Sequence, residues 1–143
     1  MKSIYKSAEG ERAVGERYLT ILKHWPVPNE QLRVPTREGG TFVVACGAEN
    51  APPLLLLHGA MANSAMWMGE VAAWAARFRV YAVDLIGEAG LSAPSRPFPG
   101  RMAGVGLRDA TAGARGKPGC ALSGRSRAAE ELDLCLKQSR CGC

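Results

Sequence analysis

The chain has 143 residues, of which 47% are hydrophobic and 22% charged, and its formal net charge is +5 at pH 7. This length suits one domain with its own hydrophobic core, and the ordinary apolar and charged fractions argue against wholesale disorder or a membrane class. The longest apolar run, at residues 51–57, is far shorter than the ~20 residues that cross a bilayer, so no membrane partner is expected.

An amphipathic helix is predicted near the N-terminus. Apolar side chains recur there at helical spacing, at Val14, Tyr18, Ile21 and Trp25. Ser7 is available as the N-cap, and the helix is expected to end at Trp25 because the following Pro26 disfavours helical backbone in the residue before it. His24 falls in the predicted last turn, where a partial positive charge suits the helix dipole. We therefore interpret His24 as a capping residue rather than a catalytic base.

A hairpin and a buried strand are predicted next. Residues 30–35 and 41–46 favour extended structure, and the Arg-Glu-Gly-Gly link at 37–40 can turn tightly. Residues 52–59 then read Pro-Pro-Leu-Leu-Leu-Leu-His-Gly, a short apolar run that ends at a glycine. Such a run suits a strand buried on both faces of a parallel sheet, although leucine by itself does not exclude a helix.

The following segment predicts a βαβ unit. A second amphipathic helix between residues 64 and 77 is indicated by apolar side chains at Trp67, Val71, Trp74 and Phe78. Residues 80–84, Val-Tyr-Ala-Val-Asp, favour another buried strand, which opens into a glycine-containing loop at 87–92. Strand, helix and strand in this order make a βαβ unit with a right-handed crossover. The sequence therefore predicts an α/β architecture.

Composition changes at about residue 98. All the tryptophans, tyrosines and phenylalanines lie at or before Phe98, and from Pro99 onward 8 basic residues face 4 acidic ones. This basic tail has no aromatic side chains for base stacking and no recognised motif, so nucleic-acid binding is not expected. Helical character returns only at residues 126–138. We expect a poorly ordered or partly helical C-terminal tail.

Four of the five cysteines lie in this tail, at Cys120, Cys135, Cys141 and Cys143. The N-terminus lacks the apolar stretch of a secretory signal, so a cytoplasmic location is expected, and there these cysteines are more readily free thiols than a disulfide framework. The pair Cys141 and Cys143 could bind a soft metal ion, but no second pair at ligand spacing accompanies it. We expect neither a metal nor a cofactor.

The stretch from the apolar strand to the glycine-containing loop resembles the α/β-hydrolase family. It combines His58-Gly59 after the strand, a tryptophan-bearing helix, a strand that ends in Asp84, and Gly-x-x-Gly-x-Ser at 87–92. In this order and spacing these features are similar to the carboxylesterase-like bacterial branch, and the resemblance covers about two thirds of the chain.

The fold implied by this resemblance is an incomplete α/β-hydrolase sheet. It would consist of an N-terminal helix, a β-hairpin and one βαβ unit. The predicted divisions are an N-terminal helix and linker at 1–28, a partial α/β-hydrolase domain at 29–98, and an unmatched tail rich in Gly, Ala, Arg and Cys at 99–143.

The resemblance implies one half of a serine-esterase site. In this family the loop after the His-Gly strand supplies one backbone N–H of the oxyanion hole. The match places that donor at Ala60, with Met61 as the alternative, and fixed donors of this kind can stabilise a tetrahedral intermediate by about 3–4 kcal/mol. His58 and Gly59 are implied to shape the loop. The alternative for this pair is structural, since any buried strand can end in glycine.

The other half of such a site is not evident in the sequence. The family pattern requires Gly-x-Ser-x-Gly at the nucleophile, followed by an acid and then a histidine. The nearest approach is Gly124-Arg-Ser-Arg-Ala128, which makes Ser126 a weak nucleophile candidate. Both histidines, His24 and His58, precede it, and a serine hydroxyl without a base is a poor nucleophile at neutral pH.

Three hypotheses for the function follow, and whether the chain is an enzyme is left open between them. The first is a serine hydrolase that acts on small-molecule carboxylic esters. The second, which we favour for this polypeptide, is an inactive hydrolase relative, truncated or altered in reading frame, whose residues from about Pro99 are not hydrolase sequence. The third treats the basic tail as an arm that binds an acidic partner. If the tail supplies no neighbour for the strand at 54–57, that strand presents an apolar edge prone to aggregation.

Overall fold

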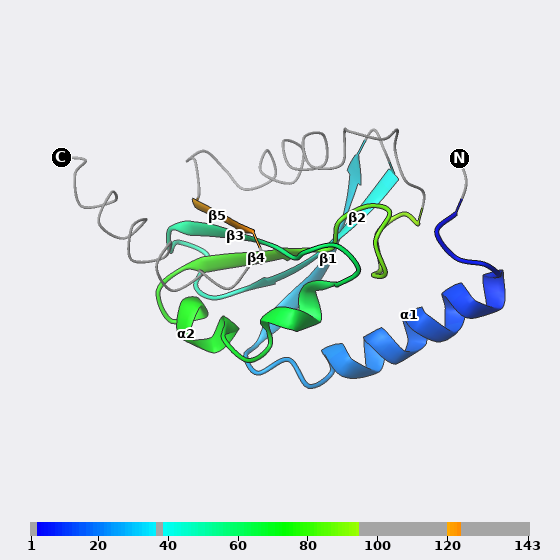
Figure 1. Ribbon diagram of the computed structural model, residues 1–143. Helices are drawn as coiled ribbons and strands as arrows, with labels where there is room; N and C mark the ends of the chain where they lie inside the picture. Colours follow the sequence, from blue (N-terminus) through cyan, green and yellow to red (C-terminus); the bar gives the residue numbers. More distant parts are fainter. Residues whose placement is uncertain (1–2, 37–38, 95–119, 124–143) are drawn as a thin grey trace.

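A computed structural model describes residues 3–36, 39–94 and 120–123 of the chain. They form a five-stranded sheet in the order β1-β2-β4-β3-β5 (Figure 1). The strands are β1 Asn29–Thr36, β2 Gly39–Cys46, β3 Pro53–Leu57, β4 Arg79–Val83 and β5 Cys120–Ser123. The helical segments are α1 Ala8–Leu22, the short 3-10 helix η1 Ser64–Trp67 and α2 Val71–Ala75. Figure 1 shows α1, η1 and α2 on the same side of the sheet.

The predicted N-terminal helix is confirmed, with changes to its buried face and its end. The Ser7 side chain accepts a hydrogen bond from Gly10 N at 3.1 Å and caps α1 as expected. Tyr18 and Leu22 are buried, whereas Val14 and Ile21 are each 38% exposed. The apolar repeat at helical spacing included Val14 and Ile21, but these two side chains are not buried, because α1 meets the sheet along a narrow stripe of residues four apart.

The end of α1 also differs from the prediction. The helix stops at Leu22, and Trp25 is buried beyond it in a turn in which Trp25 N donates to Leu22 O at 3.1 Å. His24 therefore lies after the helix rather than in its last turn. The proline at residue 26 limits how far the helix can extend, but the turn begins before that limit is reached.

The predicted hairpin is confirmed. β1 and β2 pair antiparallel in register from Asn29 opposite Cys46 to Thr36 opposite Gly39. β1 is the mostly exposed edge strand and can hold Pro35, which an interior strand would not accommodate, whereas β2 is buried over residues 41–46. The hairpin joins the rest of the sheet through β2, which pairs antiparallel with β4.

The predicted βαβ unit is confirmed in its strands. β3 and β4 are parallel and in register from Pro53 opposite Arg79 to Leu57 opposite Val83. Their helical connection differs from the single helix predicted at 64–77, because η1 and α2 are separate. Gly69 lies between them, and Glu70 at φ −123° departs from helical backbone. The low helix propensity of glycine is consistent with a break at this point.

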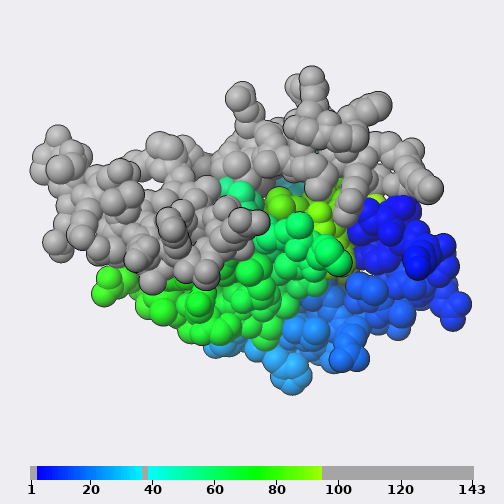
Figure 2. Space-filling model, in the orientation of Figure 1, coloured from blue at the N-terminus to red at the C-terminus, as the bar shows by residue number. Residues whose placement is uncertain are grey.

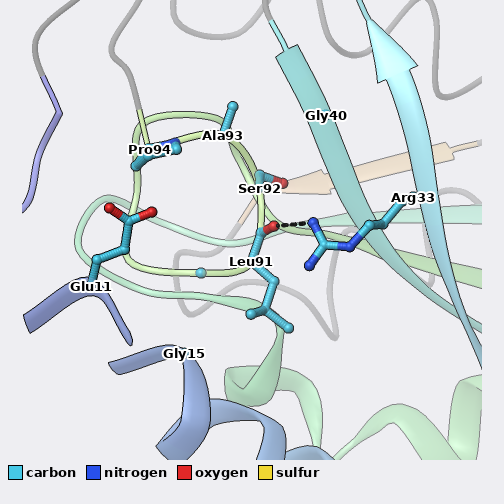
Figure 3. A pocket seen from close by; sticks show the side chains of 9 residues that line it. Glu11, Gly15, Arg33, Gly40, Leu91, Ser92, Ala93 and Pro94 are labelled. Carbon is cyan, nitrogen blue, oxygen red and sulfur yellow. Dashed lines mark hydrogen bonds between the residues drawn. The ribbon is translucent and has the colours of Figure 1, made fainter. Parts of the chain in front are cut away.

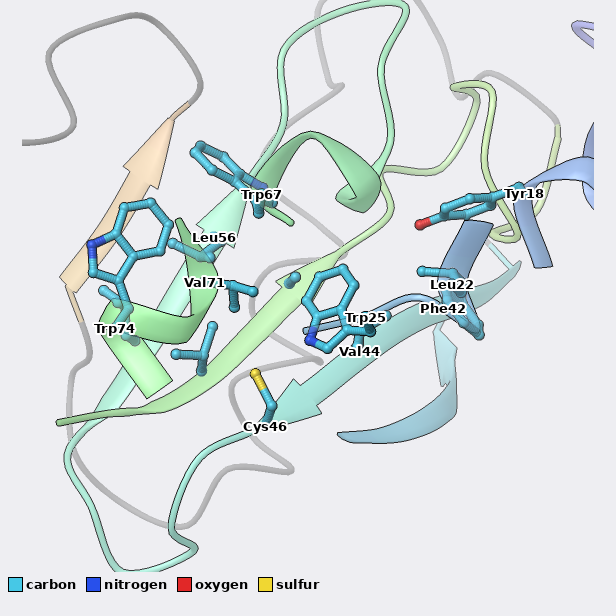
Figure 4. Close-up of a cluster of buried hydrophobic side chains, with 13 residues drawn as sticks. Tyr18, Leu22, Trp25, Phe42, Val44, Cys46, Leu56, Trp67, Val71 and Trp74 are labelled. Atoms are coloured by element: carbon cyan, nitrogen blue, oxygen red, sulfur yellow. The ribbon is translucent and has the colours of Figure 1, made fainter. Parts of the chain in front are cut away.

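The core lies between the sheet and the helical segments. Trp67 packs edge-to-face on Trp74 with ring centroids 5.7 Å apart, so the periodicity identified these buried side chains even though the helix is interrupted. Figure 4 shows the cluster that they join with the inner face of the sheet, which includes Tyr18, Leu22, Trp25, Phe42, Val44, Cys46, Leu56, Trp67, Val71 and Trp74. The opposite face of the sheet carries a smaller buried group, Val43, Leu55 and Val83.

The outer edge of β3 is paired. β5 runs parallel to β3, in register from Leu54 opposite Cys120 to Leu57 opposite Ser123 (Figure 1). The region predicted as an unmatched tail therefore contributes a strand, and the open apolar edge that would arise without a neighbour is covered at these residues. The predicted helical stretch at 126–138 lies outside the described residues, as do Ser126, Cys135, Cys141 and Cys143.

The longest helix among the described residues is α1, with 15 residues. No helix in this part of the chain is long and apolar enough to cross a membrane.

Candidate active site

The site that the sequence predicts lies where β3 and β4 end side by side. The two strands are parallel, and Leu57 is opposite Val83, so the segments that follow them begin at the same edge of the sheet. We call residues 58–63 the β3 loop and residues 84–92 the β4 loop. In open α/β sheets, ligands bind beyond the carboxyl ends of the strands. The β3 and β4 loops are therefore the described segments where chemistry is to be sought.

Asp84, the first residue of the β4 loop, is fully buried, and its carboxylate accepts four hydrogen bonds. Its Oδ1 accepts from Tyr18 Oη at 2.9 Å, Ser64 N at 2.9 Å and Ser64 Oγ at 2.7 Å. Its Oδ2 accepts from Leu91 N at 2.9 Å. A buried carboxylate is costly unless donors satisfy it. These donors come from α1, η1 and the far end of the β4 loop, so Asp84 holds three segments together.

The phenol of Tyr18 stays protonated in this arrangement. Burial raises the pKa of Tyr18, and the negative charge of Asp84 and the hydrogen bond to it raise it further. A phenol that does not ionise remains a donor. The link between α1 and the β4 loop is therefore maintained throughout the neutral range of pH.

The end of the β4 loop is fixed to β2. Ser92 Oγ donates to Asp84 O at 2.6 Å and accepts from Phe42 N at 2.8 Å. A Cβ at Gly90 would lie 2.5 Å from Asp84 Oδ2, so the carboxylate requires glycine at that position. Asp84, Gly90 and Ser92, which identified this loop in the sequence, thus stabilise its folded conformation.

His58 connects the two loops. It is buried, and its Nε2 accepts from Leu85 N at 2.9 Å. Its Nδ1 is 2.8 Å from Gly59 O, which assigns the proton to Nδ1 in a neutral ring. Backbone groups thus engage both ring nitrogens, and a ring held in this way has no free nitrogen to act as a base. The geometry is consistent with His58 and Gly59 as loop-shaping residues.

The two candidate oxyanion donors differ in their surroundings. The Met61 N–H donates to Glu88 Oε2 at 2.8 Å, and Met61 adopts φ +61° with its side chain 87% exposed. The Ala60 N–H has no hydrogen-bond partner among residues 3–36 and 39–94. Sequence analysis left these two donors as alternatives, and they differ in that the Met61 N–H is already bonded to a carboxylate whereas the Ala60 N–H is not so bonded among the described residues.

Asn63 and Glu88 join the two loops, and sequence analysis missed both. Asn63 Oδ1 accepts from Ala65 N at 3.1 Å and so caps η1, while its Nδ2 donates to Ala89 O at 2.9 Å. An Asn directly before a helical segment is a recognisable capping signal. For its contact with Met61 the sequence holds no such signal, because Glu88 accepts there from a backbone amide 27 residues away.

A separate pocket of about 350 Å³ lies between α1, β1 and the end of the β4 loop (Figure 3). Arg33 Nη1 donates to Leu91 O at 3.0 Å on one side of it, and Glu11 of α1 lies on another. The N-terminal segment runs beside the loop here, with Ile4 N donating to Pro94 O at 2.9 Å (Figure 2). No residue of the β3 loop lines this pocket, so it is distinct from the predicted oxyanion site.

A metal site is not evident where the structure can be described. Within residues 3–36 and 39–94, no group of three or more His, Cys, Asp or Glu side chains could hold a metal ion. The one cysteine of these segments, Cys46, is buried and free, and burial raises the pKa of its thiol. A buried, protonated thiol of this kind is a poor nucleophile.

The sequence and the fold of this chain are both similar to those of known carboxylesterases. No family model matches the chain. The chain is 46% identical over 80 residues to carboxylesterase YbfK of Bacillus subtilis strain 168, a match that covers 56% of this chain and 27% of that relative.

Solved structures of carboxylesterases are also similar to this chain. The crystal structure of carboxylesterase CesB (YbfK) from Bacillus subtilis aligns with a TM-score of 0.75 at 31% identity, covering 93% of this chain and 47% of that one. The naproxen esterase (carboxylesterase NP) from the same organism aligns with a TM-score of 0.72 at 31% identity, covering 95% and 47%. This chain thus spans less than half the length of either structure.

Proposed function

The N-terminal portion of this chain belongs to the α/β-hydrolase fold family, in its carboxylesterase-like branch, and from that premise we propose that it carries the oxyanion half of a site for hydrolysing small carboxylic esters. The observation that carries the proposal is the Ala60 N–H, which no described residue engages at the carboxyl end of β3. The flanking residues support it, since His58 holds one side of the loop and the Met61 amide is held on the other.

The chemistry assigned to Ala60 is stabilisation of charge. When a serine oxygen attacks an ester carbonyl, the carbonyl electrons move onto its oxygen and form a tetrahedral oxyanion. A fixed N–H aimed at that oxygen stabilises the transition state more than the neutral ester. Ala60 would supply one such donor, and the family pattern takes the second from the residue after the nucleophile.

Ser126 is the proposed nucleophile. β5 lies beside β3 and parallel to it, so its carboxyl end falls at the same edge of the sheet as the β3 loop. Ser126 follows the last residue of β5, Ser123, by three positions. This strand order supports Ser126, while the arginines on both sides of it and the absence of Gly-x-Ser-x-Gly depart from the family pattern.

We propose further that these 143 residues do not turn over esters without an added base. The chain has two histidines: both ring nitrogens of His58 are engaged by backbone groups, and His24 is exposed in the turn after α1. Loss of a triad member leaves only residual catalysis. The lost function would then be proton transfer, while the oxyanion donor remains in place.

Chemical rescue tests both parts of this proposal. The purified chain is assayed with 4-nitrophenyl acetate, with and without imidazole as an external base, against Ser126→Ala and Ala60→Pro, which removes the donor N–H. We expect no turnover above the Ser126→Ala control in the absence of imidazole. With imidazole we expect turnover that Ser126→Ala abolishes and Ala60→Pro lowers about 10²–10³-fold, the usual cost of one oxyanion donor.

Two results would contradict the proposal. Turnover without imidazole that is lost in Ser126→Ala would mean that another group acts as the base. Equal rates of the chain and Ser126→Ala at every imidazole concentration, from folded protein, would remove the assigned nucleophile. Folding of Ala60→Pro is checked by circular dichroism, with Ala62→Pro as a second proline substitution in the same loop.

A second candidate function rests on the charge of residues 99–143, where 8 basic residues face 4 acidic ones. Under this proposal the segment binds an acidic partner. Binding of poly-glutamate that weakens steeply as salt rises would support it, because screening reduces contacts between exposed charges. Binding that does not change with salt, or no binding at low salt, would count against it. The hypothesis of an altered reading frame is the alternative to Ser126 as nucleophile, because it takes the residues from about Pro99 out of the hydrolase sequence. A hydrolase-like continuation in another frame of the coding DNA would support that alternative, and its absence would overturn it.

A further inference from the structure

Glu88 contacts the β3 loop at the residue next to the proposed oxyanion donor. It belongs to the β4 loop and is only 4% exposed, although glutamate is rarely buried unless it is paired. Its Oε2 accepts from the Met61 N–H at 2.8 Å. An ionised acceptor makes this hydrogen bond stronger than one between neutral groups. The ester hydrolysis proposed above assigns no role to the Glu88 side chain.

The conformation of Met61 explains why its backbone needs such a partner. At φ +61° it lies in the left-handed region, which residues with a Cβ seldom occupy unless their surroundings enforce it. Its side chain is 87% exposed, so side-chain packing does not compensate for the unfavourable backbone. Near Met61 the β3 loop donates two hydrogen bonds to the β4 loop, from Met61 N to Glu88 Oε2 and from Asn63 Nδ2 to Ala89 O.

The Glu88 contact also determines which backbone donor is available. The Met61 N–H is used by the carboxylate, whereas the Ala60 N–H meets no acceptor in the described segments. The peptide plane between the two residues is shared, so fixing Met61 limits the orientation of the backbone at Ala60. Donor direction matters for catalysis, because a misplacement of about 1 Å can cost about 10²-fold in rate.

We propose that Glu88 is a positioning residue of the oxyanion loop: its carboxylate fixes Met61 in the left-handed conformation and so presents the Ala60 N–H. The effect of Glu88 on catalysis rests on the proposed function, whereas its hydrogen bond to the Met61 N–H is independent of that function. Glu88 acts through the backbone of Met61 and touches no reacting atom.

The test follows the Met61 amide by NMR in the ¹⁵N-labelled full chain. Three variants are compared: Glu88→Ala, which removes the acceptor, Glu88→Gln, whose amide oxygen can still accept, and Glu49→Ala, a control at an exposed glutamate in the turn before β3. In Glu88→Ala we expect Met61 amide hydrogen exchange to become about tenfold faster or more, as for a lost hydrogen bond to a charged group. Glu88→Gln is expected to retain most of the protection, and Glu49→Ala all of it.

The amides that donate to Asp84, those of Ser64 and Leu91, report on the integrity of the fold in each variant. They are expected to keep their exchange rates in Glu88→Ala. If Glu88→Ala does not fold, the unmodified chain still decides the matter, because a Met61 amide that exchanges as fast as an unstructured peptide overturns the contact. An unchanged Met61 exchange rate in folded Glu88→Ala overturns it as well.

The ester assay separates this inference from the proposed function. Where imidazole-dependent turnover is present, Glu88→Ala is expected to lower kcat about tenfold with KM little changed, and Glu88→Gln to restore most of it. An unchanged kcat in a Glu88→Ala variant whose Met61 amide exchanges faster would overturn the positioning role. If the unmodified chain shows no turnover above the Ser126→Ala control even with imidazole, the proposed function is overturned, and the amide result stands on its own.

Discussion

The β3 loop and the β4 loop begin at the same edge of the sheet, but they are held in different ways. The β4 loop is fixed from several sides: Asp84 accepts from α1 and η1, and Ser92 bonds to β2. The β3 loop is fixed mainly by the β4 loop, and it keeps an exposed Met61 and an unengaged Ala60 N–H among the described residues. The comparison indicates that the β4 loop is scaffold, and it fits the proposed role of the β3 loop, in which the Ala60 N–H is the oxyanion donor.

Among the substitutions that test this difference between the two loops, removal of the Asp84 carboxylate is expected to lower the free energy of unfolding most. In Asp84→Ala four donors lose their acceptor inside the core. Breaking a buried hydrogen-bonded network of this kind costs about 3–5 kcal/mol, so the free energy of unfolding should fall by that amount or the chain should not fold. Urea denaturation measures the change. A loss below about 1 kcal/mol would mean that the β4 loop is not the scaffold.

Substitution of Gly90 should have the next largest effect. The Cβ of Gly90→Ala would lie 2.5 Å from Asp84 Oδ2, and overpacking of this kind costs about 1–3 kcal/mol. Gly69→Ala is the matched control, since a Cβ there meets no atom within 4 Å. Thermal or urea unfolding of the two variants should show a loss only at Gly90. Equal stability of both would contradict the close approach of loop backbone and carboxylate.

Loss of the Tyr18 hydroxyl is expected to have a smaller, pH-dependent effect. Tyr18→Phe removes one donor to Asp84 and should cost about 1–2 kcal/mol at pH 7. Because the pKa of Tyr18 is raised in the folded state, its contribution is fully present below the unfolded value of about 10 and is lost as pH rises above it.

The pH dependence gives a direct measurement. The difference in unfolding free energy between the unmodified chain and Tyr18→Phe should shrink between pH 9 and pH 11, as unfolded tyrosine ionises at about pH 10. The pKa values of Tyr5 and Cys46 are also raised, but both residues are present in each protein, so the difference isolates Tyr18. A difference that stays constant or grows over this range would contradict a buried, protonated Tyr18.

Relief of the left-handed backbone at Met61 is expected to have the smallest effect. Glycine adopts φ +61° without a steric penalty but loses more conformational entropy on folding, and the exposed Met61 side chain contributes little packing. Met61→Gly should therefore change the free energy of unfolding by less than about 1 kcal/mol. Chemical denaturation measures it, and a loss of several kcal/mol would mean that the β3 loop is as firmly integrated as the β4 loop.

Much of the fold could be predicted from the sequence because its signals are local. Ser7 before an apolar helical repeat predicted α1, and the two extended segments at 30–35 and 41–46, with the link at 37–40 between them, predicted the hairpin. The repeat of Trp67, Val71 and Trp74 predicted which side chains are buried, but it did not predict the break between η1 and α2. Periodicity reports which face is buried, whereas continuity of a helix also depends on how its segments fit against the sheet.

In the candidate site, too, some features have local signals in the sequence and others depend on tertiary contacts. By itself the sequence determined the α/β class and the position of the β3 loop, and the resemblance supplied Ala60 and Met61 as candidate donors, because these follow from neighbouring residues in the chain. Only the tertiary structure decided that β5 pairs with the edge of β3, that both ring nitrogens of His58 form hydrogen bonds with backbone groups, and that Glu88 accepts from the Met61 amide. The physical reason is that these contacts join residues far apart in the chain, and the folded backbone alone brings them within hydrogen-bonding distance.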